Sequence, residues 1–137
     1  MFRKSGIGLA VFAVLALTVS IAAAGNAHFV GTPNLSTSGN NLIASGKVAG
    51  LGNIDQIHVT VSGEAACINP GNKKPQAANK QTVSGDGDFP VQNGKANFSL
   101  SASATFQPDC TPPMSVQWSN VSIVVTDPAG NVLATFP

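Results

Sequence analysis

Hydrophobic and polar residues alternate along the stretch from Lys95 to Phe106. The apolar residues fall on one parity and asparagine, serine or threonine on the other: Phe98, Leu100, Ala102, Ala104 and Phe106 alternate with Asn97, Ser99, Ser101, Ser103 and Thr105. Successive side chains of a β-strand point to opposite faces of its sheet. The pattern therefore predicts a strand with one buried face and one solvent-exposed face.

A second alternating run leads to the first of the two cysteines. It sets β-branched apolar residues against polar ones, with Ile57, Val59 and Val61 on one parity and His58, Thr60 and Ser62 on the other. β-Branched residues of this kind are typical of strands. The apolar parity continues to Cys67, which we expect to point inward unless Gly63 introduces a β-bulge.

Less regular runs predict further strands at 42–48, 81–84, 89–91, 116–126 and 132–136, with short extended pieces at 28–30 and 35–37. The segment 89–91 should lie at a sheet edge, because Pro90 cannot donate to a ladder. In 116–126, Trp118 and Val121 fall on opposite parities, which indicates either a bulge near Ser119-Asn120 or a strand covered on both faces.

Turn-forming residues separate these runs at 38–41, 50–53, 85–88, 92–95 and 127–131. Asn93-Gly94 favours a type I′ hairpin turn, in which both central residues need a positive φ. Seven or eight short strands, with no helical periodicity after residue 24, indicate an all-β fold. We expect one domain over residues 28–137, an antiparallel β-sandwich of the immunoglobulin-like class.

Residues 1–27 have the composition of a secretory signal peptide. Arg3 and Lys4 precede an uncharged apolar run of 18 residues, Ile7 to Ala24, and small residues offer cleavage sites after Ala24 or after Ala27. An uncleaved membrane anchor is the alternative, since a spanning helix needs about 20 residues. We favour cleavage, which predicts a secreted protein, in the medium or at the cell surface, without a membrane contact of its own.

The remaining chain carries five lysines, no arginine and six acidic residues, which gives a net charge of −1. This surface offers no basic patch for nucleic acid and no arginine for bidentate phosphate binding. We therefore expect neither a nucleic-acid partner nor a cofactor.

The two cysteines favour a disulfide bond between Cys67 and Cys110 over two free thiols, because a signal peptide directs the chain to an oxidising compartment. The bond would close a loop of 44 residues. In the chain-entropy model, a loop of that length stabilises the fold by about 4 kcal/mol.

The disulfide would bring together the two least regular segments, the loops 68–80 and 107–115. The second loop contains Pro108, Pro112 and Pro113. Loops on a rigid scaffold often carry binding sites. The candidate partner-binding residues are Lys73, Lys74, Lys80, Asp109 and Met114. The alternative is that the bond only restrains two flexible loops that have no binding role.

No catalytic constellation is recognisable. His58 with Asp55 and a serine is the one candidate for a Ser-His-Asp site, but no Gly-x-Ser-x-Gly motif supports it. We therefore interpret His58 as a solvated strand histidine. Glu64 with Asp109 is a candidate carboxylate pair for glycoside hydrolysis, although no sequence feature sets their distance.

Metal binding is also disfavoured. Asp86-Gly87-Asp88 could offer oxygen ligands to calcium, with Asp55 or Asp127, but it lacks the ligand run of a calcium loop. An acidic turn is the better interpretation. Two distant histidines and two disulfide-bonded cysteines do not suit zinc. The single tryptophan, Trp118, is better explained as a core residue than as a platform for sugar rings.

Several segments carry a resemblance to a known group of proteins: Gly50-Leu51-Gly52-Asn53, Gln56-Ile57-His58-Val59, Ala66 to Gly71, Pro75 to Lys80, Asp88 to Gly94 and Phe106 to Met114. Over these segments the chain resembles a family of uncharacterised small secreted bacterial proteins, chiefly actinobacterial. The resemblance implies secretion and assigns no activity or functional residue. It also implies that the sequons at Asn34, Asn97 and Asn120 are unused.

We expect a secreted, non-catalytic β-sandwich module that binds an extracellular protein, a cell-wall component or a polymer through loops 68–80 and 107–115. Two alternatives remain open. One is a small secreted hydrolase. The other is a structural or coat protein that self-associates through edge strands such as Val132 to Phe136. In solution we expect a monomer or weak self-association.

Overall fold

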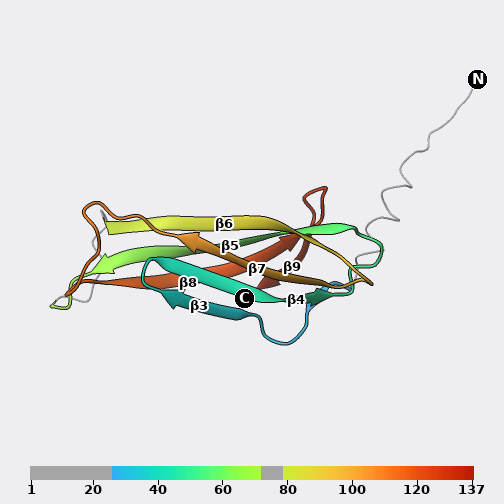
Figure 1. Ribbon diagram of the computed structural model, residues 1–137, viewed down its shortest axis with the longest axis horizontal. Helices are drawn as coiled ribbons and strands as arrows, with labels where there is room; N and C mark the ends of the chain where they lie inside the picture. Colours follow the sequence, from blue (N-terminus) through green and yellow to red (C-terminus); the bar gives the residue numbers. More distant parts are fainter. Residues whose placement is uncertain (1–25, 72–78) are drawn as a thin grey trace, which may run out of the picture.

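The computed structural model describes residues 26–71 and 79–137 (Figure 1). These residues form eight strands and no α-helix. The strands are β2 (His28–Phe29), β3 (Asn34–Ser38), β4 (Asn41–Ala49), β5 (Gln56–Ile68), β6 (Lys80–Pro90), β7 (Ala96–Ser103), β8 (Ser115–Thr126) and β9 (Val132–Phe136). All their pairings are antiparallel, which confirms the predicted all-β class. Residues 1–25, which make up most of the predicted signal peptide, lie outside the described residues.

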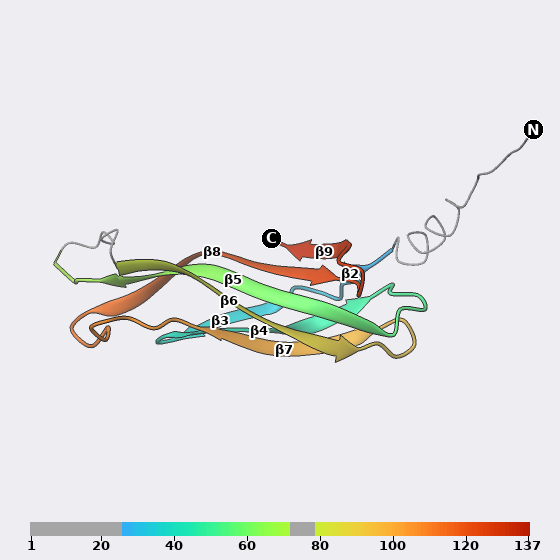
Figure 2. The same ribbon diagram turned by 90° about the horizontal axis from the view of Figure 1, so that it is seen from above.

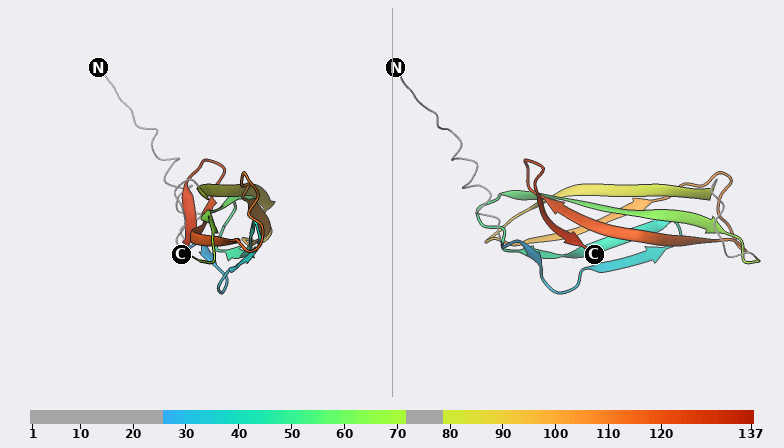
Figure 3. Two further views of the ribbon diagram at one scale, coloured as in Figure 1. Left: turned by 90° about the vertical axis from the view of Figure 1, so that its left-hand side faces the viewer. Right: turned by 180° about the vertical axis from the view of Figure 1, so that it is seen from behind.

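The strands form two sheets that pack face to face in an elongated sandwich (Figures 1 and 2). In the first sheet, β4 pairs with β2 and β3 along one edge and with β7 along the other. The second sheet has the order β6-β5-β8-β9. The β4–β5, β6–β7 and β7–β8 connections each pass from one sheet to the other. Figure 3 shows this two-layered arrangement along the long axis.

The core lies between the sheets and consists of the apolar parities of the long strands. On β5, Ile57, Val59 and Val61 are fully buried, and on β7 the buried positions alternate with exposed ones. Both alternating patterns in the sequence are therefore confirmed. Phe98 packs edge-on against Phe29, with 6.2 Å between the ring centroids. This contact ties the short strand β2 to the core.

One bulge explains why Trp118 and Val121 fall on opposite parities. The register between β5 and β8 shifts between Ser62 and Glu64, and Asn120 has a φ of 51°. Gly63 has no side chain where Val121 and Trp118 pack. The extra residue therefore lies on β8, at the bulge predicted near Ser119-Asn120, whereas Gly63 continues the ladder with β6 opposite Val83 and leaves the parity of β5 unchanged.

The expected turn at 85–88 is wrong, because those residues continue β6. Gly85 pairs with Val61 and Gly87 with Val59, so both glycines occupy inward positions of an unbroken ladder. Gly-Asp-Gly-Asp has local turn propensity, and long-range pairing with β5 overrides it. The hairpin at Asn93-Gly94 forms as predicted, with φ values of 56° and 76°.

The sandwich is closed on the side where β6 and β7 lie next to each other. A Cβ atom on Gly85 would collide with the carbonyl oxygen of Ser101, so glycine permits this close approach of the two sheets. The Gln81 side chain donates to the carbonyl oxygen of Thr105 at 2.8 Å and accepts from its amide at 3.3 Å. Backbone contact and side-chain hydrogen bonds thus join these two edges.

Candidate functional site

The disulfide predicted between Cys67 and Cys110 is present, with 5.7 Å between the two Cα atoms. Cys67 lies near the end of β5 and is 6% exposed, so it points inward as its parity predicts. Cys110 is half-buried in the connection between β7 and β8. The bond therefore attaches this connection to the end of the second sheet.

Residues 107–114, which we name the proline loop, form an exposed surface at this end. All its residues except Cys110 and Met114 are exposed. The Met114 amide donates to the Thr111 carbonyl oxygen at 2.9 Å, and the Met114 sulfur lies 3.8 Å from Cys67 Sγ. The loop thus presents an exposed chain whose base packs on the disulfide.

The structure brings part of the predicted site together. Lys80 is exposed at the start of β6, where it pairs with Ala66 next to the disulfide, and Asp109 is exposed in the proline loop. Met114 is half-buried against Cys67, so it supports the loop more than it extends its outer surface. Lys73 and Lys74 lie outside the described residues.

A second constellation, in which His58 lies between two aspartates, was not predicted from the sequence. On β6, Asp88 is opposite His58 and Asp86 is opposite Thr60, so all three side chains share the outer face of the sheet. His58 Nδ1 is 2.7 Å from Asp88 Oδ1, and His58 Nε2 is 2.9 Å from Asp86 Oδ2. Parity on β6 could have revealed this face, had 85–88 been interpreted as strand.

The two carboxylates favour the charged form of the imidazole. The hydrogen bond to Asp88 is the largest cause that raises the pKa of His58 above 6.5, and the charges of Asp88 and Asp86 act in the same direction. Partial burial opposes them. His58 is still 38% exposed, so water screens both ion pairs.

This geometry does not supply a general base or a metal site. Both ring nitrogens of His58 contact carboxylates, so neither is free to take a proton from a serine hydroxyl. The carboxylates sit at opposite edges of the ring. Accordingly, in the described part of the chain no group of three or more His, Cys, Asp or Glu side chains is arranged to hold a metal ion.

The other residues considered for chemistry lie apart from His58. Asp55 precedes β5 in the connection from β4. Glu64 is in the middle of β5, opposite Thr82 and Ser119, whereas Asp109 is in the proline loop. Trp118 is half-buried: it packs against the edge of the core and donates its indole N–H to the Gly39 carbonyl oxygen at 3.3 Å.

A hollow of about 380 Å³ lies beside His58 and Asp88, and Thr126, Asp127 and Pro128 form its other wall. The Asp127 carboxylate accepts hydrogen bonds from the Ala129 and Asn131 amides, each at 2.9 Å. Burial would raise the pKa of Asp127, but the hydrogen bonds from Asn131, Ala129 and Gly130 outweigh it and lower that pKa below 3.8. This carboxylate thus stabilises its own turn.

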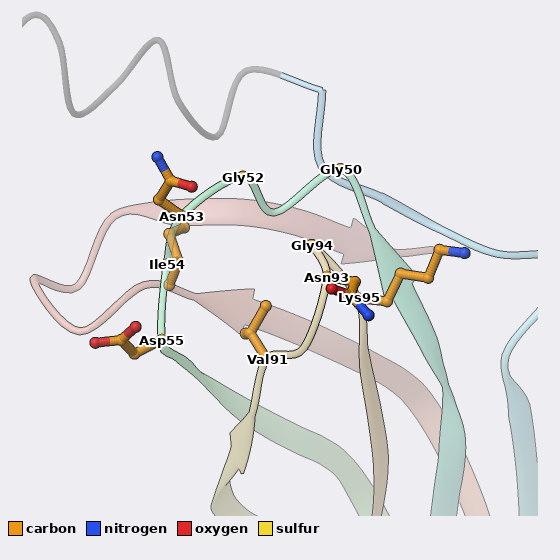
Figure 4. A pocket seen from close by; sticks show the side chains of 9 residues that line it. All are labelled: Gly50, Gly52, Asn53, Ile54, Asp55, Val91, Asn93, Gly94 and Lys95. Atoms are coloured by element: carbon orange, nitrogen blue, oxygen red, sulfur yellow. The ribbon is translucent and has the colours of Figure 1, made fainter.

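A wider hollow of about 650 Å³ lies just before the start of β5, at the end of the sandwich away from the disulfide, between residues 50–55 and residues 91–95 (Figure 4). We name these two segments the glycine end. Lys95 and Asp55 lie on opposite rims, with Ile54 and Val91 between them. The hollow is open and shallow, so we do not assign it a ligand.

Within residues 26–71 and 79–137 there is no helix long and apolar enough to cross a membrane. Comparison with protein-family models, with curated proteins and with solved structures found no match for this chain. The resemblance to secreted actinobacterial proteins therefore stays a prediction, and the function has to be argued from the geometry of the molecule.

Proposed function

We propose that this protein is an exported, non-catalytic binding module with an immunoglobulin-like β-sandwich. Its partner is an extracellular protein or polymer, recognised through the proline loop and the adjacent Lys80. The observation that carries the proposal is the exposed loop whose base is held by the Cys67–Cys110 bond.

The strand order supports the immunoglobulin-like assignment. Counting β2 and β3 as one interrupted edge strand, the first sheet contains the first, second and fifth strands, and the second sheet contains the third, fourth, sixth and seventh. Immunoglobulin constant-type sandwiches likewise separate the first, second and fifth strands from the third, sixth and seventh, but their fourth strand lies in the sheet of the first. Two further features differ from antibody domains, because here the disulfide joins β5 to a connecting loop and Trp118 lies on β8.

The physical argument for binding is preorganisation. Ordering a flexible loop on association opposes binding, and a loop already held in one shape avoids part of that loss. The proline loop contains three prolines, a disulfide cysteine and the Thr111–Met114 hydrogen bond. Its exposed surface combines Asp109 with neutral side chains, and Lys80 adds a positive charge nearby. This combination suits a polar partner of low net charge.

The state of His58 supports a non-catalytic role. It is the histidine nearest to any candidate acid, and both its nitrogens are held by Asp86 and Asp88. A hydrolytic serine would need one of them. No observation therefore favours the hydrolase alternative over the binding module.

The test is a capture experiment with the purified, oxidised protein as bait. The targets are proteins of the source's culture medium, insoluble peptidoglycan and chitin. The variant K80A/D109A removes one positive and one negative charge beside the proline loop. The matched control K95A/D55A makes the same change at the glycine end. We expect one partner retained by wild type and control and lost by K80A/D109A.

Equal capture by all three baits would show that the binding surface lies outside the proline loop. No capture by any bait would contradict the binding module itself. Export is tested separately, by N-terminal sequencing of the protein recovered from the medium. A chain beginning at Gly25 or His28 supports cleavage, and a chain retaining Met1 contradicts it.

A further inference from the structure

The proline loop is attached to the sandwich at its two ends and at one point between them. Before it, Phe106 is buried in the core, and after it, Ser115 begins β8 and pairs with β5. In the described part of the chain, no hydrogen bond joins residues 107–113 to another segment. Between its ends, the loop is therefore tied to the sandwich by the Cys67–Cys110 bond.

Apolar packing adds little to this attachment. Pro108, Pro112 and Pro113 are exposed, so they bury little surface against the sandwich. Cys110 and Met114 are the loop residues that pack against the core. Met114 directly precedes β8, so the strand holds it in place. Cys110 has no such neighbour, and breaking its bond would release the middle of the loop.

Cys67 keeps its position without the bond, because β5 holds it. In the ladder between β5 and β8, Cys67 is opposite Val116, and the residues on either side of it are paired as well. The loss of about 4 kcal/mol expected without the disulfide is below the roughly 5–15 kcal/mol of a typical domain. The reduced chain should therefore keep its two sheets and lose the order of the proline loop.

We propose that the Cys67–Cys110 bond is a reversible redox switch, with which thiols in the surroundings control the order of the proline loop. A thiolate attacks Cys110 Sγ, the S–S bond breaks, and Cys67 Sγ leaves as a thiolate that takes up a proton. A second thiolate then attacks the reductant's sulfur in this mixed disulfide. Cys110 Sγ leaves with the electron pair and takes up a proton in turn, and a disulfide joins the two reductant molecules.

The exposure of the two cysteines favours attack at Cys110. Cys67 is 6% exposed and lies on the inner face of β5, whereas Cys110 is half-buried in an exposed loop. The rate of thiol–disulfide exchange depends on which sulfur a thiolate can reach. A thiolate approaches in line with the bond that breaks, so attack on Cys67 would have to come from the interior. Attack on Cys110 comes from the side of the loop.

The bond can form again in only one way. The chain has two cysteines, so oxidation within one molecule can restore only the Cys67–Cys110 bond. In the reduced chain, Phe106 and Ser115 still hold the two ends of the loop at the sandwich. The short stretch between them keeps Cys110 near Cys67, and closing a short loop costs less conformational entropy than closing a long one.

The consequence for recognition rests on the proposed function, whereas the switch itself does not. A loop that is ordered before binding loses less conformational entropy on association. Reduction removes that advantage, so the reduced protein should bind the partner of the proline loop more weakly. The redox state of the surroundings would then regulate binding at this surface.

The test is ¹⁵N relaxation by NMR of the mature protein, first oxidised and then fully reduced with dithiothreitol. Backbone order parameters are about 0.85 in rigid segments and below about 0.6 in flexible ones. After reduction we expect values below about 0.6 at Asp109, Cys110 and Thr111, and values of about 0.85 at Val59 and Val61. Reoxidation should restore the first set of values. The matched control is C67S/C110S, in which dithiothreitol should change nothing.

A second measurement locates the attack. The oxidised protein is treated with glutathione, the free thiols are blocked with iodoacetamide, and the modified peptides are identified by mass spectrometry. We expect glutathione on Cys110 and the blocking group on Cys67. Glutathione mainly on Cys67 would contradict the proposed route.

Order parameters that stay at about 0.85 at residues 109–111 of the reduced protein would overturn the switch. A loss of order at Val59 and Val61 would overturn it as well, because reduction would then unfold the sandwich. In the capture experiment, the reduced bait should retain less partner than the oxidised bait, and equal retention would contradict the effect on binding. If the oxidised bait captures nothing, the proposed function fails, and the relaxation measurement still decides on the switch.

Discussion

The two ends of the sandwich are held together in different ways. At one end, a covalent bond between Cys67 and Cys110 fixes the proline loop to β5. At the glycine end, the connections are held by backbone hydrogen bonds, among them Leu51 N to Gly94 O at 3.0 Å and Val91 N to Asp55 O at 2.9 Å. Twelve residue steps of β5 separate the ends, roughly 40 Å at about 3.3 Å per residue.

The two ends differ in whether local residues or a distant residue stabilise them. The glycine end consists of short turns whose residues suit their backbone conformations, with a positive φ at Gly50, Gly52, Asn93 and Gly94. The proline loop lacks regular structure and depends on a cysteine 43 residues away. A surface loop that is covalently restrained yet exposed is the better candidate for recognition.

The largest effect expected is at the disulfide end. C67S/C110S should lower the free energy of unfolding by about 4 kcal/mol, because the unfolded chain regains the entropy of an open loop. Urea denaturation measures the loss, and reduced wild type should match the double variant. A loss below about 1 kcal/mol in C67S/C110S would show that the glycine end and the core hold the fold without the bond.

The glycine end should be sensitive to backbone strain instead. G94A should lower the free energy of unfolding by about 1–2 kcal/mol, because alanine disfavours the φ of 76° that the hairpin requires. The control is G71A beside the disulfide, where a Cβ meets nothing within 4 Å and φ is not in the left-handed range. Equal losses in the two variants would mean that turn conformation does not distinguish the ends.

Asp127 supports a turn next to the hollow beside His58. D127A should lower the free energy of unfolding by about 1 kcal/mol, because it removes acceptors for the Ala129 and Asn131 amides. The pKa of Asp127 is below 3.8 in the folded protein, so its contribution is present above about pH 4 and is lost in stronger acid. D109A, in the proline loop, should change stability by less than about 0.5 kcal/mol.

The smallest effect expected is a pH dependence at His58. Its folded pKa is raised above 6.5, so the stabilisation is full below that pH and is lost as pH rises through the folded pKa. Because the His58 side chain is exposed to water, its ion pairs stabilise the fold by less than about 1 kcal/mol. Urea unfolding of wild type and H58Q at about pH 5 and about pH 9 measures it. The free energies of unfolding of wild type and H58Q should differ less at the higher pH, and an unchanged difference would contradict the ion pairs as its cause. In D86N/D88N this pH dependence should be absent.

Local patterns in the sequence predicted much of the fold. The alternation along β5 and β7, the parity change around Trp118, the Asn93-Gly94 hairpin and the disulfide all correspond to observed features. Each depends on residues close in sequence or, for the disulfide, on there being only two cysteines. Period-2 alternation follows directly from strand geometry, which is why these predictions succeeded.

The cluster of His58, Asp86 and Asp88 was harder to predict than the disulfide end, because it depends on long-range register. Asp86 and Asp88 have local turn propensity, and only pairing with β5 brings them to either side of His58. The closure between β6 and β7 depends on Gly85 lying against Ser101, a contact between different sheets. A turn motif does not contain that information, and alternation within β6 shows which residues share a face but not their register against β5, where a shift of one residue would reverse every face.

The central claim is that recognition takes place at the disulfide end. Hydrogen–deuterium exchange of the oxidised protein, with and without the partner captured by the wild-type bait, tests it most directly. We expect slower exchange in the proline loop, at Thr111 and Met114 above all, and unchanged exchange at Leu51 and Val91 of the glycine end. Protection confined to the glycine end, with the proline loop unaffected, would contradict it.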